Sequence, residues 1–183
     1  NLGHLEDARG VKILGLLGAS LFKEVEMEID YRNNLLILYK LDKEGNRIVG
    51  NERTQLPDVD VSIDITNDII FMDVVAAEKK LRFCLDTGAE RNVISNTLSN
   101  KIIKHFQLTT PGGLTGSNGN SQLILNGQMD SVIIGGKSFV AMPFILTNLN
   151  YLQLVYDTNI NGILGYDYLS KGIVTINHKK KRL

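Results

Sequence analysis

The apolar positions along the chain predict a β-rich structure. Residues 58–65 alternate Asp or Ser with Val or Ile, and this period of two is typical of a strand with one solvent-exposed face. Residues 69–77 and 81–85 are denser apolar runs, and the polar Glu78-Lys79-Lys80 lies between them. Two such runs around a short polar turn predict a β-hairpin.

The second half of the chain predicts more strands, one short helix and one long loop. Residues 95–104 begin with cap-type residues and continue with apolar positions at helical spacing. Residues 109–122 include Pro111 and several glycines, so a long and mobile loop is expected there. Strands are expected at 123–125, 131–134 and 139–146, separated by turns at Asn126-Gly127 and Gly135-Gly136. The predicted fold class is all-β, with short helices.

One apolar run ends in residues that can carry chemistry. The buried-type strand 81–85 stops at Asp86-Thr87-Gly88, and the apolar pattern resumes at Val93. A carboxylate beside a core needs local hydrogen bonds or has its proton equilibrium altered, so Asp86 is the first candidate for chemistry. Cys84 lies inside the same apolar run with no basic neighbour in sequence, which is typical of a small core residue rather than a nucleophile.

Composition excludes several other classes of protein. The chain has 43% hydrophobic residues, and its 20 Lys and Arg balance 20 Asp and Glu, so no global charge favours nucleic acid. No apolar run approaches the roughly 18 residues of a membrane span. The single cysteine excludes an internal disulfide and leaves the compartment undecided. The start at Asn1 has no initiator Met and no signal pattern, which is typical of a mature product or a fragment.

Two motifs together resemble a known family. Asp86-Thr87-Gly88-Ala89 after an apolar strand resembles the active-site signature of the retropepsin-like aspartic peptidases. Gly162-Ile163-Leu164-Gly165, about 75 residues downstream, resembles the family's apolar-apolar-Gly element, which passes under the active-site loop and leads into a short helix. The resemblance covers roughly residues 64–183 and implies a retropepsin-like acid protease barrel.

The resemblance also implies roles for individual residues. Asp86 would be the general acid and base, Thr87 and Gly88 its supporting loop, and no metal or organic cofactor is needed. The substrate would be an extended polypeptide lying beneath the glycine-rich loop, where the family has its flap. The expected substrate-binding residues are Ala89, Gly116, Ser117, Asn118 and Gly119. The family carries Ser or Thr shortly after the signature, whereas this chain has Glu90-Arg91-Asn92, and the Asn92 amide is expected to donate the hydrogen bond instead.

The chemistry requires a second carboxyl group, because two neighbouring acids that share one proton can divide the roles of base and acid. This chain has one Asp-Thr-Gly. Asp157-Thr158-Asn159 is interpreted as a turn and Asp167 as a capping or surface acid. The acids of residues 58–64 are interpreted as a solvated strand face rather than a metal site. Two sources of a partner stay open: a homodimer with a second Asp86, or an upstream copy of the same fold.

An internal similarity favours the upstream copy. Residues 15–22 align with 162–169, and residues 27–32 with 174–179, at a constant spacing of 147 positions. Similarity at a fixed spacing indicates a duplicated unit, although coincidence between two glycine-initiated strands stays open. The expected organisation is the C-terminal part of an upstream copy at 1–40, a linker at 41–57 and a peptidase domain at 58–183.

The leading functional hypothesis is an aspartic-type endopeptidase. The first alternative is a catalytically inactive binding or dimerisation module of the same fold. The second is an ordinary β domain whose Asp-Thr-Gly is accidental. The terminal basic run 179–182 is interpreted as a solvated strand end rather than a site for an acidic polymer.

Overall fold

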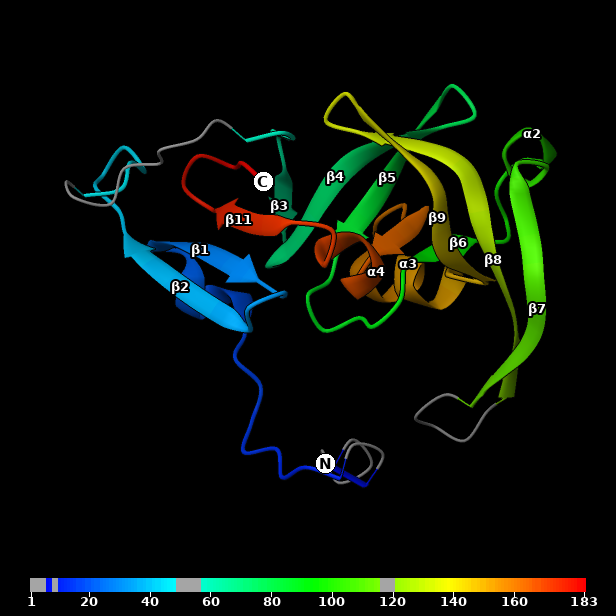
Figure 1. Ribbon diagram of the computed structural model, residues 1–183, viewed down its shortest axis with the longest axis horizontal. Helices are drawn as coiled ribbons and strands as arrows, with labels where there is room; N and C mark the ends of the chain where they lie inside the picture. Colours follow the sequence, from blue (N-terminus) through cyan, green and yellow to red (C-terminus); the bar gives the residue numbers. More distant parts are fainter. Residues whose placement is uncertain (1–5, 8–9, 49–56, 116–120) are drawn as a thin grey trace.

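A closed β-barrel lies beside a small three-stranded sheet (Figure 1). The computed structural model describes residues 6–7, 10–48, 57–115 and 121–183. The small sheet comprises β1 (Val25–Asp30), β2 (Leu35–Lys40) and β11 (Ile173–Asn177), and the 3-10 helix η1 (Ala19–Phe22) precedes it. The larger sheet comprises β3 (Asp64–Thr66), β4 (Ile69–Ala76), β5 (Lys79–Leu85), β6 (Val93–Ser95), β7 (Phe106–Thr115), β8 (Ser121–Ile134), β9 (Lys137–Thr147) and β10 (Gly162–Leu164). The α-helices are α2 (Asn100–Ile103), α3 (Asn150–Tyr156) and α4 (Tyr166–Leu169).

The barrel closes through β4. The larger sheet has the order β3-β4-β5-β10-β6-β9-β8-β7, and β4 also pairs with β8 at Val75↔Ile133. Six strands therefore form a closed ring, from β4 through β5, β10, β6, β9 and β8. Alternate side chains of these strands point inward and fill the ring. The fully buried ones include Val74, Phe83, Ile94, Met129 and Phe144.

The predicted all-β fold class and the first hairpin are confirmed. β4 and β5 pair antiparallel from Ile70↔Leu85 to Ala76↔Lys79. The turn falls at Ala77 and Glu78, both with positive φ, slightly earlier than the polar run indicated. The turn at Gly135-Gly136 is also confirmed, because both glycines have positive φ between β8 and β9.

The predicted loop at 109–122 and the predicted turn at Asn126-Gly127 are wrong. β7 continues to Thr115 and β8 begins at Ser121, so most of the glycine-rich stretch is paired strand. Gly127 lies inside β8, where a Cβ would overlap the ring of Phe106 and the carbonyl of Gln107. Glycine is needed there for close packing and not for a turn. The local sequence alone does not distinguish these two roles of glycine.

Two element boundaries differ from the predictions, and one helix is additional. The helix predicted at 95–104 is only the single turn α2, because residues 93–95 are taken up by β6 between β9 and β10. The strand predicted at 58–65 pairs as β3 only from Asp64, while Val61 and Ile63 bond to residues 181–183. Helix α3 is not predicted by the pattern. No helix in the described ranges has the length and apolarity that crossing a bilayer requires.

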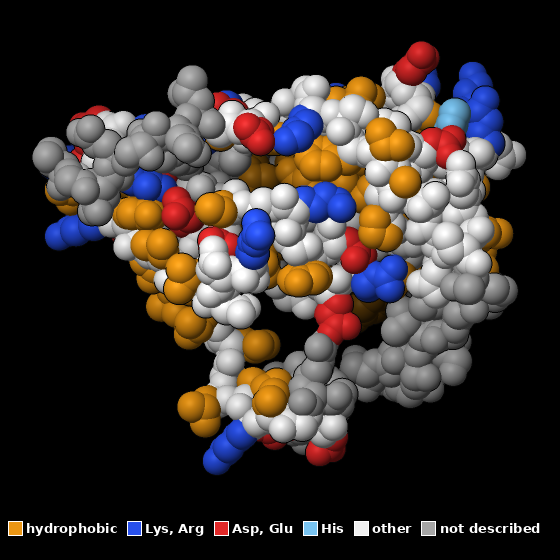
Figure 2. Space-filling model, in the orientation of Figure 1, with side chains coloured by type: hydrophobic (Ala, Val, Ile, Leu, Met, Phe, Trp, Pro, Cys, Tyr) orange, Lys and Arg blue, Asp and Glu red, His pale blue; other side chains and the backbone are white. Residues whose placement is uncertain are grey.

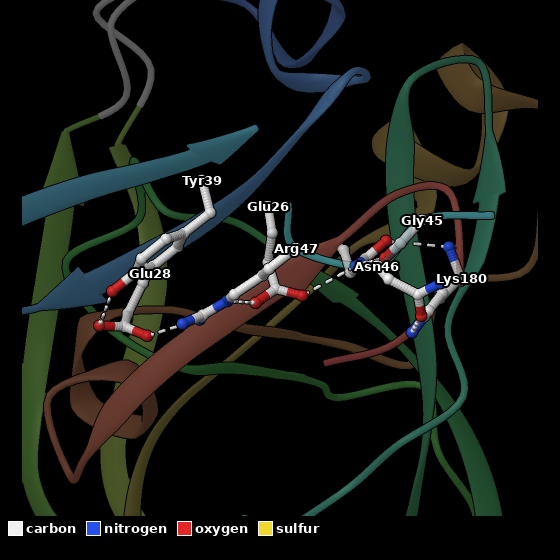
Figure 3. A network of polar contacts seen from close by, with 8 residues as sticks. Glu26, Glu28, Tyr39, Gly45, Asn46, Arg47 and Lys180 are labelled. Atoms are coloured by element: carbon white, nitrogen blue, oxygen red, sulfur yellow. Dashed lines mark hydrogen bonds and ion pairs between the residues drawn. The ribbon is translucent and has the colours of Figure 1, made fainter. Parts of the chain in front are cut away.

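Buried charges fix the small sheet (Figure 3). Glu26 of β1 is buried and accepts hydrogen bonds from Arg47 Nε at 2.6 Å and from Asn177 Nδ2 at 2.8 Å. Arg47 Nη2 also contacts Glu28 Oε2 at 2.8 Å, and its guanidinium stacks over the ring of Tyr39. Because a buried charge is tolerated only when it is paired, this network holds residues 41–48 against β1 and β11. Residues 41–48, which belong to the expected linker, therefore pack against the small sheet.

Candidate active site

Asp86 lies on a loop that directly follows β5 and is hydrogen-bonded to the neighbouring strand β10. β5 delivers the chain to Leu85, and β10 runs parallel beside it with Leu164 opposite Leu85. The Asp86 backbone N–H donates to Leu164 O at 3.0 Å, and Asp86 Oδ1 accepts from the Gly88 N–H at 2.8 Å. The carboxylate itself is exposed. The loop is thus anchored through its backbone while the acid stays accessible.

The glycines of the second motif let β10 approach this loop. A Cβ at Gly162 would overlap the ring of Phe83, and one at Gly165 would lie 2.5 Å from Ala89 O. Tyr166 N–H then donates to Ala89 O at 2.8 Å. Only glycine permits such contact between backbones. The segment 162–165 therefore lies directly against the Asp86 loop, as the resemblance implied.

Asn92 has a different role from the one expected. Its side chain is fully buried, where its Nδ2 donates to Pro143 O at 3.1 Å and its Oδ1 accepts from the Gly165 N–H at 2.9 Å. The expectation that this amide donates to Asp86 is wrong, because both of its polar atoms are engaged elsewhere. Asn92 instead ties the end of the Asp86 loop to β9 and to the start of α4.

Asp167 secures the same loop and is not a surface acid. It lies in the first turn of α4, and its side chain is only 18% exposed. Asp167 Oδ2 accepts from Arg91 Nε at 2.9 Å and from the Asn92 N–H at 3.1 Å. Sequence reasoning missed this pair because 76 positions separate Arg91 from Asp167. The signal available was the charged Arg91 that follows the signature.

A cavity of about 560 Å³ opens beside Asp86. Asp86 and Thr87 form one part of its wall, and Leu17, Phe22 and His178 form another. Its other lining residues are mostly apolar and include Met27, Ile29, Ile70, Leu152 and Ile176. Asp68 also lines it, but its carboxylate is paired with Lys23 Nζ at 2.6 Å. The candidate acid thus faces a large and mainly apolar space.

Cys84 lies in the wall of this cavity and behaves as a core residue. Burial, together with the charge of Asp86, raises the pKa of its thiol to about 12. The sulfur therefore stays protonated at neutral pH, and a protonated thiol is a poor nucleophile. Reading Cys84 as a packing residue agrees with this environment.

A second cavity, of about 420 Å³, borders the same loop. It is lined by Thr87, Gly88, Ala89, Glu90 and Tyr166. Three of the expected loop and substrate residues therefore share one concave surface with a carboxylate and an aromatic ring. The other expected substrate residues, Gly116, Ser117, Asn118 and Gly119, lie outside the described residues.

The other acids singled out from the sequence have ordinary partners. Asp157 ends α3 in a left-handed conformation with φ 47°, so its interpretation as a turn residue is confirmed. The aspartates of residues 58–64 form ion pairs with basic side chains: Asp58 with Lys137, Asp60 with Arg182 and Asp64 with Arg82. Within the described ranges, no three His, Cys, Asp or Glu side chains are grouped closely enough to hold a metal ion.

Comparison with known proteins places these motifs in a family. Residues 72–168 match the family model described as "Aspartyl protease", and this range is just over half of the 183 residues. It contains both the Asp86 loop and the segment 162–165. A search of curated proteins gives no match.

Solved structures with similar folds include three proteases. A retropepsin-like aspartic protease from Rickettsia conorii has 18% identity and a TM-score of 0.45, over 63% of this chain and 97% of that chain. The EIAV protease in complex with the inhibitor HBY-793 has 20% identity and a TM-score of 0.40, over 55% and 85%. The retroviral protease-like domain of Ddi1 from Leishmania major has 13% identity and a TM-score of 0.42, over 56% and 76%.

The assignment rests on the match to the family model, which runs from within β4 to within α4 and includes the loop that carries Asp86. The closed ring of six strands and the glycine contacts beneath the loop agree with it. The chain belongs to the aspartyl protease family.

Proposed function

We propose that the protein is an aspartic-type endopeptidase that hydrolyses peptide bonds with a water molecule activated by a pair of aspartates, one of them Asp86. The observation that carries the proposal is the position of Asp86, exposed at the mouth of a 560 Å³ cavity on a loop whose backbone is held by β10. A fixed backbone and an accessible carboxylate are what acid–base catalysis requires.

The chemistry follows from sharing a proton between two carboxyl groups. Close together, the two acids cannot both ionise, so one stays protonated at a pH where the other is charged. The charged group accepts a proton from water as it attacks the carbonyl carbon, and the protonated group donates to the carbonyl oxygen. Thr87 and Gly88 shape the loop, and the Gly88 N–H orients the Asp86 side chain by donating to Oδ1. This reaction needs no metal or organic cofactor.

The proposed substrate is an extended polypeptide. The cavity lined by Ala89, Glu90 and Tyr166 gives room for side chains next to the scissile bond, and the hairpin of β7 and β8 provides backbone groups for strand-like pairing. We place residues 58–183 in the peptidase domain and residues 1–40 in the C-terminal part of an upstream copy, with 41–57 between them. The second acid comes from a partner lobe, either a twin chain or this upstream copy.

A cleavage assay tests the proposal. A peptide library is incubated with the wild-type protein and with Asp86→Asn, at acid and at neutral pH, and the products are identified by mass spectrometry. The substitution keeps size and hydrogen bonding but removes the titratable group, so cleavage should fall by about 10³-fold or more. Asp73→Asn, at an exposed β4 position paired with Lys80, serves as the matched control and should retain activity.

Cleavage that persists in Asp86→Asn would rule out the proposed mechanism. A folded wild-type protein that binds peptides without cleaving them would instead support the binding-module alternative.

A further inference from the structure

The ring of Tyr166 lies in the wall of the cavity of about 420 Å³ that borders the Asp86 loop. The Tyr166 N–H donates to Ala89 O at 2.8 Å, so the backbone of this residue is fixed to the loop. The residue is nevertheless 49% exposed. A large ring that is held through its backbone and open on one side can receive a ligand group without rearrangement.

A second aromatic ring packs against the first. In Figure 1 the strand β1 points toward α4, and Tyr31 follows the end of that strand. The rings of Tyr31 and Tyr166 lie edge-to-face, with centroids 5.3 Å apart and an interplanar angle of 84°. Aromatic pairs prefer this geometry. The two half-buried or exposed rings therefore form one aromatic surface, to which the end of β1 and the start of α4 each contribute one side chain.

The turn that carries Tyr31 is ordered by Asp30. Asp30 Oδ1 accepts hydrogen bonds from the Arg32 N–H at 3.0 Å and from the Asn33 N–H at 3.1 Å. Its other oxygen, Oδ2, accepts from Asn33 Nδ2 at 2.7 Å. A side chain on a turn that is held in this way loses little freedom when a ligand binds, and such preorganisation favours affinity.

The aromatic surface lies close to the candidate acid. Ile29, two positions before Tyr31, lines the larger cavity together with Asp86 and Thr87, and Thr87 also lines the cavity of Tyr166. Burial raises the pKa of Tyr31 above its ordinary value of 10, and Tyr166 and the charge of Asp86 raise it further. Charges near a protein surface act over a short range only. A ligand group on the aromatic surface is thus a neighbour of Asp86.

The small sheet contributes to this site although it lies outside the range 72–168 that matches the family model. Tyr31 belongs to the turn after β1, while Met27 and Ile29 of β1 and Leu36 of β2 line the larger cavity. Hydrophobic side chains also gather at the surface over the β1–β2 hairpin in Figure 2. The family match therefore does not account for the part of the site that the small sheet supplies.

A side chain with an aromatic ring fits the wall formed by Tyr31 and Tyr166 best. Aromatic rings attract one another in edge-to-face and offset geometries, and this attraction adds to what burial of the same area gives to an aliphatic group. The exposed part of Tyr166 offers a ligand such a contact. A volume of about 420 Å³ is typical of small-ligand pockets and leaves room for one ring.

We propose that Tyr31 and Tyr166 form the aromatic wall of a substrate subsite beside the Asp86 loop, and that this subsite selects an aromatic side chain of the polypeptide. The selected residue lies near the scissile bond, because Thr87 and Gly88 line the same cavity. That a bond is cleaved there rests on the proposed function, whereas the preference of the cavity for an aromatic group does not.

Peptide binding to the Asp86→Asn variant of the 183-residue chain tests the subsite without turnover. The chain has no tryptophan, so the emission of a tryptophan-containing peptide reports the binding of that peptide alone. Three peptides that carry Phe, Leu or Lys in place of the tryptophan then compete with this probe. The Phe peptide should bind about fivefold more tightly than the Leu peptide.

Substitutions in the Asp86→Asn background locate the preference. Tyr31→Leu should reduce the preference for Phe over Leu to less than about twofold, and Tyr166→Leu should do the same. Tyr31→Phe keeps the ring and should retain the preference. Tyr151→Leu is the matched control, since Tyr151 is 73% exposed on α3 and belongs to neither cavity wall. Circular dichroism verifies that each variant is folded.

Several results would overturn the proposal. Equal affinities of the Phe and Leu peptides would do so, as would a preference that survives in either leucine variant of the pair. Tightest binding by the Lys peptide would instead identify a subsite for a basic side chain, and failure of the tryptophan probe to bind would exclude the subsite altogether.

The same peptides separate this proposal from the proposed function. If the wild-type protein cleaves none of them while the preference for Phe persists, the result contradicts the proposed function and leaves the subsite established. Cleavage that is lost in Asp86→Asn, without any preference for Phe over Leu, contradicts the subsite alone.

Discussion

The N-terminal segment (residues 15–30) and the C-terminal segment (residues 162–177) have similar sequences and opposite environments. Leu164 is fully buried in the barrel, whereas its counterpart Leu17 is 71% exposed. Tyr168 is also buried in α4, at 8% exposed, while its counterpart Leu21 is 64% exposed. In Figure 1 the chain before η1 runs away from the barrel. The same pattern therefore becomes core in one place and surface in the other, depending on what packs against it.

This difference shows which elements form from the local sequence alone and which form only when other strands pack against them. The single-turn helix and the strand form in both segments, as η1 and β1 in one and α4 and β11 in the other. The glycine–apolar–apolar–glycine stretch forms a strand only in the C-terminal segment, where β5 and β6 flank it. Burying a leucine contributes about 2 kcal/mol only when a partner surface is present. Substitutions at equivalent positions should therefore have unequal effects.

The largest difference is expected for leucine at the second apolar position. Leu164→Ala removes a fully buried side chain beside the Asp86 loop and should destabilise the 183-residue chain by about 4 kcal/mol. Leu17→Ala should change stability by less than about 0.5 kcal/mol. Urea unfolding followed by circular dichroism measures both. Equal losses would show that residues 15–18 are packed in solution as the C-terminal segment is.

The glycines should give the next largest difference. Gly162→Val forces a side chain into the ring of Phe83 and the carbonyl of Val93, and overpacking of this kind should cost about 3 kcal/mol. Gly15→Val meets no atom within 4 Å and should be neutral in this chain. The midpoint of thermal unfolding distinguishes them. Tolerance at Gly162 would contradict the close approach of β10 to β5.

The polar residues at the strand ends should differ by a smaller amount. Asn177 is buried, and its Nδ2 donates to Glu26 Oε2 and to Gly45 O, whereas the equivalent Asp30 is on the outside of its turn. Asn177→Ala leaves buried partners unsatisfied and should cost about 2 kcal/mol. Asp30→Ala should cost about 0.5 kcal/mol, since water can replace its hydrogen bonds. Urea titration at neutral pH compares the two variants.

The smallest expected effect is a pH dependence that arises from His178. Burial and the nearby Lys23 lower the pKa of His178 below its ordinary value of 6.5, while Asp68 acts in the opposite direction. The unfolded chain therefore binds a proton that the folded chain does not, so stability should fall as the pH drops below about 6.5. His178→Phe should weaken this fall when melting temperatures at pH 7.5 and 5 are compared.

Tyr31→Phe is the matched control for this experiment. Burial, Tyr166 and the charge of Asp86 raise the pKa of Tyr31 above 10, so its hydroxyl does not titrate in the acid range. An acid destabilisation that His178→Phe leaves unchanged would locate the titration elsewhere.

The sequence by itself determined where the loop that carries Asp86 lies, directly after a buried strand. The apolar run 81–85 followed by Asp86-Thr87-Gly88 predicted a buried strand that ends at an acid needing local hydrogen bonds, and in the structure β5 ends at Leu85 and Asp86 Oδ1 accepts from the Gly88 N–H. The resemblance of residues 162–165 to the family's apolar-apolar-Gly element implied that this segment passes under the loop. The strand prediction succeeded because hydrophobic periodicity and strand length depend on neighbouring residues.

Only the tertiary structure decided how distant residues combine. Gly127 suggested a turn and instead lies under Phe106, and Asn92 suggested a hydrogen bond to Asp86 and instead joins Pro143 to Gly165. The antiparallel pairing of β1 with β11 likewise depends on strands 147 positions apart. A sequence pattern specifies what a residue is able to contact, whereas the packing of remote strands selects which contact it makes.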